Sequence, residues 1–139
     1  MTKHGYQYVG EAEVSDIGIY KDYGPQPVWR HALTFSYAAA TWGATLTQNY
    51  TSGYIDYTNT GLVGGANYPA SRDVESNVTW DASYTYRGVK NLEVLFGIKN
   101  ILNQDPPVSR NDQGFQVGYD ATLASALGRQ FRLAAKYKF

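Results

Sequence analysis

Residues 74–87 read VESNVTWDASYTYR, and apolar and polar side chains take turns along them. A period of two is typical of a β-strand with one apolar and one wet face, and no helical spacing fits this order. We therefore predict a strand here. Its apolar positions are the even ones, Val74, Val78, Trp80, Ala82, Tyr84 and Tyr86, and the odd positions from Glu75 to Arg87 are polar.

The same alternation recurs on both sides of this stretch. At the end of the chain, GRQFRLAAKYKF has an apolar side chain at every second position from Phe131 to Phe139. We therefore expect an all-β chain of about five antiparallel, meandering strands. The other four strands are predicted within residues 29–38, 42–57, 92–102 and 128–139.

The connections between the predicted strands are alternately short and long. Only about four residues separate the first strand from the second and the third from the fourth, which predicts two tight hairpins. The segments 58–73 and 104–127 are long and rich in Gly, Pro, Asn and Asp, which favour turns and irregular surface structure. Residues 119–127 could form a helical turn or lead into the last strand, and the first 27 residues resemble another long loop.

Composition narrows the functional classes. The 139 residues hold 12 Lys+Arg and 12 Asp+Glu, so no net charge draws the chain to nucleic acid, and no nucleic-acid partner is predicted. Cysteine is absent, which excludes disulfides, thiolate nucleophiles and sulfur-based zinc sites. No catalytic constellation is present in the sequence, and 2 scattered histidines make no metal site. We predict neither enzymatic activity nor a cofactor.

Strand length and aromatic content favour a membrane protein. Aromatic residues make up 15% of the chain, and Tyr and Trp suit a boundary between water and hydrocarbon. No run reaches the roughly 18–20 apolar residues of a transmembrane helix, and the start lacks the apolar core of a signal peptide. Strands of about ten to twelve residues, tilted by about 45°, instead rise about 23–28 Å, close to the apolar band around outer-membrane barrels. A soluble β-rich binding module is the alternative.

Three segments, taken in order, resemble one family. GPQPVWRHALTFSY (24–37) and then WGATLTQNYTSGYIDY (42–57) are similar to a late hairpin of the TonB-dependent outer-membrane receptors. LEVLFGIKNILNQDPP (92–107) resembles their penultimate strand, with its Asn-rich turn and Asp-Pro-Pro. GYDATLASALGRQFRLAAKYKF (118–139) resembles their closing segment, which ends on an aromatic residue. The resemblance covers the chain from about Tyr20 to Phe139.

The resemblance implies a C-terminal part of a transmembrane β-barrel of about 22 strands, which contains a plug domain. Residues 1–139 would be a fragment, with 1–27 mostly external loop and 28–139 strands and loops. The whole receptor would import siderophore-iron, cobalamin or a similar scarce ligand across the outer membrane of a Gram-negative bacterium. Its partners would be the lipid bilayer, the rest of the barrel and plug, the outer-membrane assembly machinery, and the inner-membrane energy-coupling complex through a missing N-terminal part. An open sheet leaves unpaired edges in lipid, so the fragment is expected to be inactive alone.

Candidate site residues are few. Arg72 and Arg110 lie on predicted long loops and are candidates to meet an anionic ligand. Charged residues that alternate with apolar ones along the strands are expected to form a solvated lumen wall rather than an acid-base site, and His31 is expected at the membrane interface. By the resemblance, the signal recognised during barrel assembly comprises Phe131, Leu133, Tyr137 and Phe139.

Overall fold

The computed structural model describes residues 5–6, 14–15, 17–21, 24–57, 71–109 and 118–139. This part of the chain consists of β-strands, turns and irregular segments. It divides into two units, and each is described by itself. The sheet unit comprises His31–Tyr50, Val78–Asp105 and Ser125–Phe139, and the loop unit comprises Met1–Arg30, Thr51–Asn77 and Pro106–Ala124.

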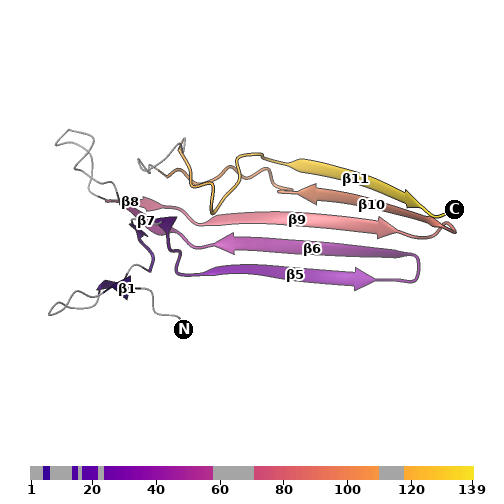
Figure 1. The fold of residues 1–139 in the computed structure, drawn as a ribbon, viewed down its shortest axis with the longest axis horizontal. Helices are drawn as coiled ribbons and strands as arrows, with labels where there is room; N and C mark the ends of the chain where they lie inside the picture. Colours follow the sequence, from indigo (N-terminus) through magenta and orange to yellow (C-terminus); the bar gives the residue numbers. More distant parts are fainter. Residues whose placement is uncertain (1–4, 7–13, 16, 22–23, 58–70, 110–117) are drawn as a thin grey trace. The chain divides into compact units, whose positions relative to one another are not determined.

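Five long strands form one antiparallel sheet in the order β11-β10-β9-β6-β5 (Figure 1). The spatial order follows the chain order, as in a meander, and this confirms the prediction of an all-β chain with five antiparallel strands. The sheet is open, so the described residues do not close a barrel, and β5 and β11 are its edges. The strands are β5 (Arg30–Ala38), β6 (Trp42–Thr51), β9 (Asn77–Tyr86), β10 (Leu92–Lys99) and β11 (Gln130–Tyr137).

Both predicted tight hairpins are confirmed, and they lie at the same end of the sheet (Figure 1). Between β5 and β6, the amide of Ala39 donates to the carbonyl oxygen of Trp42 over 2.8 Å. The turn between β9 and β10 ends on Asn91, whose φ of 63° lies in the left-handed region that asparagine tolerates better than most residues. Lys138, just after β11, donates its amide to the carbonyl oxygen of Asn91 over 3.0 Å. We call this end of the sheet the short-turn end.

Two of the predicted strands each extend across a break in the structure. Residues 42–57 form β6 and then a separate strand, β7 (Tyr54–Tyr57), and residues 74–87 include the end of β8 (Ser71–Val74) before β9 begins. At the first break, Gly53 lies close to the backbone of β8. A Cβ on Gly53 would lie 2.5 Å from the carbonyl oxygen of Val74. The alternation of side chains continues with the same parity across both breaks, so the sequence pattern could not show that the strand partner changes.

The loop unit has its own strand pairs and a small core. β7 pairs antiparallel with β8, with Tyr54 opposite Val74. Both side chains are buried and pack with the half-buried Leu123. The predicted loop over the first 27 residues contains two short antiparallel pairs of two residues per strand. These pairs are β1 (Gly5–Tyr6) with β2 (Val14–Ser15), and β3 (Tyr20–Lys21) with β4 (Gly24–Pro25).

The connection from β10 to β11 begins earlier than predicted and contains a helical turn. The predicted strand over residues 92–102 ends at Lys99, and Asn100 turns the chain with a φ of 51°. Of the two expectations for residues 119–127, the helical turn is confirmed, because the amide of Ala124 donates to the carbonyl oxygen of Asp120 four residues earlier, over 3.0 Å. The Asp120 carboxylate also accepts the amide of Thr122 over 2.8 Å, as at a helix N-terminus.

Candidate membrane-facing surface

Strand register decides which side chains share a face of the sheet. Phe96 on β10 lies opposite Tyr84 on β9 and opposite Leu133 on β11. Because side chains alternate between faces along every strand, the apolar positions of these three strands fall on one side. We call this side the apolar face and the other the polar face. Further apolar-face positions are Ala82, Tyr86, Leu92, Val94, Ile98, Phe131, Ala135 and Tyr137.

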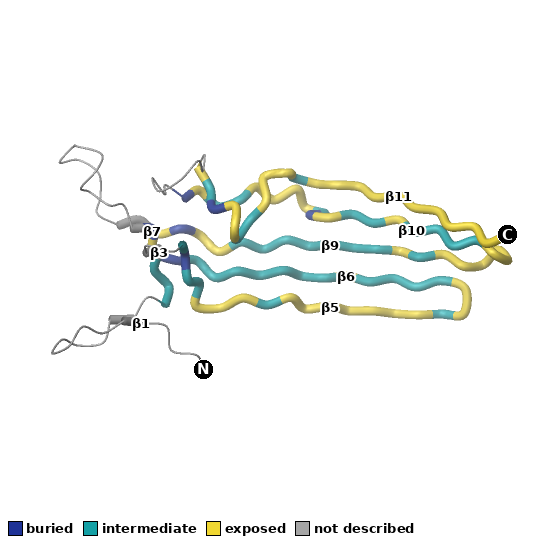
Figure 2. The backbone as a smooth tube through the Cα atoms, viewed as in Figure 1, coloured by how far each residue is buried: buried dark blue, intermediate teal, exposed yellow. Residues whose placement is uncertain are grey.

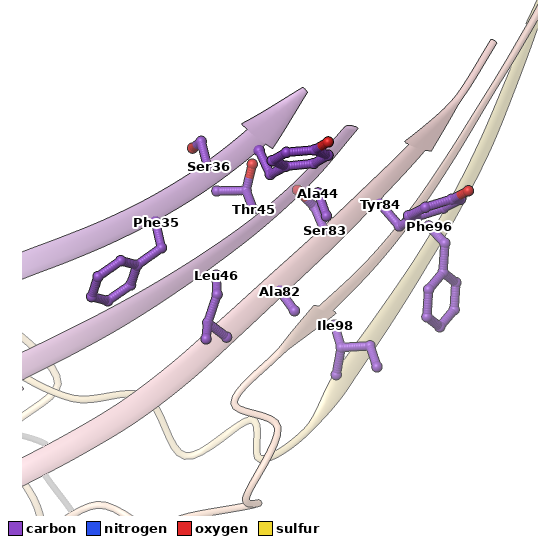
Figure 3. Close-up of a pocket in the computed structure, with 11 residues that line it drawn as sticks. Phe35, Ser36, Ala44, Thr45, Leu46, Ala82, Ser83, Tyr84, Phe96 and Ile98 are labelled. Carbon is purple, nitrogen blue, oxygen red and sulfur yellow. The ribbon is translucent and has the colours of Figure 1, made fainter. Parts of the chain in front are cut away.

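Strands β5 and β6 continue the same two faces. Figure 3 shows Phe35 and Leu46 on the same side of the sheet as Ile98, whereas Ser36 and Thr45 point to the other side. A shallow depression over the apolar face is lined mostly by carbon atoms. Ligand pockets instead combine an enclosed apolar wall with a few convergent polar groups. We conclude that this depression is part of an extended apolar surface rather than a small-molecule site.

Within the sheet unit, no second layer covers the apolar face. Phe35 is 56% exposed, Phe131 66% and Leu133 75%. Among the described residues, the hydrophobic side chains that are buried are Tyr54 and Val74, which belong to the loop unit. Figure 2 shows the two edge strands exposed along almost their whole length. Contiguous exposed apolar surfaces are typical of sites that contact a membrane, another protein or a ligand, and of aggregation-prone surfaces.

Aromatic rings gather on the apolar face at the short-turn end. The ring centroids of Tyr37 and Trp42 are 5.1 Å apart, and those of Trp42 and Tyr84 are 5.8 Å apart. Tyr137 and Phe139 meet edge to face with centroids 5.2 Å apart. Tyr and Trp combine an apolar ring with a polar tip, so a row of them suits the boundary between hydrocarbon and water.

A second group of rings stands near the other end of the strands. The rings of His31 and Tyr50 stack with centroids 5.2 Å apart, and His31 Nε2 lies 3.3 Å from Oε1 of Gln48. Trp42 and Tyr50 are eight residues apart on β6, which places them about 26 Å apart along the strand. Aliphatic and phenyl side chains such as Leu46 occupy the band between the two aromatic groups.

The polar face carries hydrogen-bonded and charged side chains. Thr34 and Thr47 hydroxyl oxygens lie 3.1 Å apart across β5 and β6. The Asn49 amide donates to Oδ2 of Asp81 over 3.0 Å. Near the short-turn end, Arg87 Nε donates to Oε2 of Glu93 over 2.6 Å, and both side chains are exposed. These contacts bridge neighbouring strands along a wet surface, and they place no activated nucleophile beside a base.

An asparagine-rich turn shapes the exit from β10. Oδ1 of Asp81 accepts the amide of Asn100 over 2.8 Å. The Asn100 side chain in turn accepts the amide of Gln104 and donates to its carbonyl oxygen, both over 2.9 Å. Oδ1 of Asn103 accepts the amide of Arg129, which directly precedes β11, over 2.9 Å. The turn thereby holds the end of β10 and the approach to β11 together, which explains why asparagine recurs at this spacing.

One of the two candidate arginines falls among the described residues. Arg72 lies in β8 rather than on a loop, with its Cα opposite that of Asp56, and Arg110 falls outside the described residues. Their role with an anionic ligand stays a prediction.

The four residues predicted as an assembly signal are exposed. Three of them stand on the apolar face of the edge strand β11, and Phe139 follows that strand. Their role in assembly also stays a prediction. They are Phe131, Leu133, Tyr137 and Phe139.

One buried polar contact was not foreseen. The Ser109 hydroxyl donates to Oδ2 of Asp56 over 3.0 Å, and both side chains are buried in the loop unit. The two residues are 53 positions apart, and neither belongs to a motif, so no signal in the sequence pointed to this pair.

The described residues contain no group of three or more His, Cys, Asp or Glu side chains arranged to hold a metal ion. In that same part of the chain, no helix is both long and apolar enough to cross a membrane.

No protein-family model, no curated protein and no solved structure matches the chain. The surface geometry and the sequence therefore carry what is proposed below.

Proposed function

We propose that the five-stranded sheet is part of the transmembrane β-barrel of an outer-membrane transport receptor of the TonB-dependent type. Its apolar face contacts lipid and its polar face lines a water-filled lumen. The whole receptor imports siderophore-iron, cobalamin or a similar scarce ligand into a Gram-negative bacterium. In this proposal the sheet contributes barrel wall, and the chain catalyses no reaction.

The observation that carries the proposal is the uncovered apolar face with an aromatic group near each end. A soluble sheet gains stability by packing its apolar face against another layer, whereas a barrel wall buries that face in hydrocarbon. Outer-membrane barrels have an apolar band flanked by aromatic girdles at both interfaces. The groups around Trp42 and Tyr50, with Leu46 between them, follow that arrangement.

Strand length and edges add support. The long strands have 8 to 10 residues, and a tilted transmembrane β-strand needs about 9–11. Backbone groups on an open edge have no water to bond in a bilayer. In a bilayer, β5 and β11 would therefore each need a further strand to pair with, and a larger barrel would provide these strands.

The choice of receptor family rests on the three sequence segments. Two of these segments, 92–107 and 118–139, contact each other in the structure, because Asn103 in the first accepts the amide of Arg129 in the second. The assembly machinery, the plug and the inner-membrane energy-coupling complex enter as partners through the family resemblance.

A detergent experiment tests the membrane assignment. In brominated maltoside micelles, a single tryptophan introduced as Ala82→Trp in a tryptophan-free background should be strongly quenched, because it faces the detergent. The matched control, Ser83→Trp on the polar face, should be quenched much less. The protein without detergent should aggregate. A monodisperse protein in plain buffer, with equal quenching at both positions, would instead favour the soluble β-rich binding module.

A further inference from the structure

A hollow at the short-turn end of the sheet is lined mainly by basic side chains. Its volume is about 380 Å³, and its lining contains four basic residues but a single carboxylate. We call it the cationic hollow. Its charged residues are Arg87, Lys90, Glu93, Lys136 and Lys138.

Strand register brings these residues together from three separate segments. Glu93 of β10 lies opposite Lys136 of β11, so the two are neighbours on the polar face. Arg87, which directly follows β9, donates its Nε to Oε2 of Glu93 over 2.6 Å. The amide of Lys138 donates to the end of the β9–β10 turn over 3.0 Å, and the same turn carries Lys90. The chain therefore places the last cations of β11 beside the cations of a turn about 50 residues earlier in the sequence.

The cationic hollow has more positive charge than its own carboxylate can balance. Glu93 is engaged by Arg87, and among the described residues no other ion pair involves a side chain of the hollow. The neighbouring β5–β6 turn, residues 39–41, contributes no charge, although the carbonyl oxygen of Thr41 accepts the Arg87 amide over 2.6 Å. Ammonium groups gathered in one place repel one another and attract an anion of several charges.

We propose that the cationic hollow binds a phosphate anion that has two or more negative charges. A doubly charged phosphate group presents three strong acceptor oxygens at one centre, so several side chains can donate to it at once. Lysine recognises phosphate as a point charge on a flexible stem, which suits Lys90, Lys136 and Lys138 at the ends of their elements. A free pyrophosphate and the phosphomonoester headgroup of a lipid share this chemistry.

The inference goes beyond the proposed function and does not depend on it. It requires the register of β10 with β11 and the turn after β9, and both are features of the sheet itself. If the sheet is a barrel wall, the short-turn end lies at the boundary between membrane and water, where lipid headgroups and soluble anions are both present.

Titration calorimetry with pyrophosphate, on the protein in maltoside micelles at low ionic strength, tests the inference. Low salt is needed because salt screens exposed charges. We expect saturable binding. The variant with Lys90→Gln, Lys136→Gln and Lys138→Gln should bind pyrophosphate on the order of tenfold more weakly. The matched control Lys99→Gln, at the far end of β10 and opposite Gln130, should bind it as the parent does.

A variant of opposite sign separates charge from misfolding. Glu93→Gln removes the carboxylate of the hollow and releases the Arg87 guanidinium to the anion. It should therefore tighten pyrophosphate binding several-fold, whereas damage to the fold would weaken it. Weaker binding by a Glu93→Gln variant with parent-like circular dichroism would contradict the inference.

A lipid arm distinguishes the two sources of phosphate. Binding of phosphatidic acid, added to the same micelles, would be measured by native mass spectrometry for the parent, the triple variant and Lys99→Gln. Binding that depends on the three lysines, for pyrophosphate, for phosphatidic acid or for both, supports the inference and names the source. Binding of neither, equal weakening in Lys99→Gln, or citrate bound as tightly as pyrophosphate in the same calorimetry would overturn it.

Discussion

At the scale of single residues, neighbours in one strand meet different surroundings. Ala82 lies opposite Ile98 and belongs to the apolar face, whereas Ser83 lies opposite Gly97 on the polar face. The two positions share one strand, one depth and nearly the same side-chain size. Any difference in their tolerance to a charge must therefore come from the face that each occupies.

If the sheet is the barrel wall proposed above, we expect Ala82→Arg to destabilise the protein in lipid by about 2–4 kcal/mol, because the guanidinium would lie in hydrocarbon near the middle of the strand. Ser83→Arg should cost far less, since the polar face is wet. The free energy of unfolding in urea, measured in lipid vesicles for both variants, checks this. Equal costs at the two positions would contradict the assignment of the faces.

At the scale of the elements, the connection from β10 to β11 depends on a few backbone conformations. Asn100 and Asn103 have φ values of 51° and 54°, and Gly128, near the start of β11, has a φ of 61°. A Cβ on Gly128 would lie 2.9 Å from Oδ1 of Asn103, the atom that accepts the Arg129 amide. Glycine therefore relieves both backbone strain and a close contact at this position.

Gly128→Ala should lower the free energy of unfolding by about 1–2 kcal/mol, the usual cost of a left-handed conformation for a residue with a Cβ. Gly97→Ala is the matched control. Its Cβ would meet only ordinary contacts, the nearest at 3.7 Å from Cβ of Arg132, so its stability should stay within about 0.5 kcal/mol of the parent. Denaturant titration of both variants in micelles gives the two values, and a neutral Gly128→Ala would remove this role.

At the scale of the whole molecule, the net charge of the chain is zero, but basic and acidic residues are divided unequally between the two units. The sheet unit contains seven basic and three acidic residues, and the loop unit contains the other five basic and nine acidic residues of the 12 and 12. The tight turns all belong to the sheet unit, and the long connections contribute to the loop unit. In a barrel, the two kinds of connection would face opposite sides of the membrane, since each strand crosses it once.

Labelling of cells that produce the protein tests this sidedness. The chain has no native cysteine, so each introduced thiol reports one position. Ser71→Cys, in β8 of the long connection, should react with an impermeant maleimide on intact cells. Val89→Cys, in the tight turn between β9 and β10, should react only after the cells are permeabilised. The reverse order of labelling would invert the proposed topology.

The two faces of each strand could be predicted because a period of two follows from the backbone itself. Trp80, Ala82 and Tyr84 share a face whatever strand lies beside them. The ends of the strands were harder to predict, since the alternation of side chains is unchanged on both sides of the break at Gly53. The Asp56–Ser109 contact was not predicted for a related reason, because a contact between residues 53 positions apart does not show in any local sequence pattern.

The sequence by itself determined that this protein is made of strands with one apolar and one polar face, joined by alternately tight and long connections. Periodicity and turn residues act within a few positions of the chain, and so they can be read without knowing the fold. Only the tertiary structure decided which strands are neighbours, that β11 is an edge with Arg132 and Lys136 along it, and that the rings of Tyr37, Trp42 and Tyr84 form one group. These features depend on register between distant segments, which the side chains of all the strands fix together.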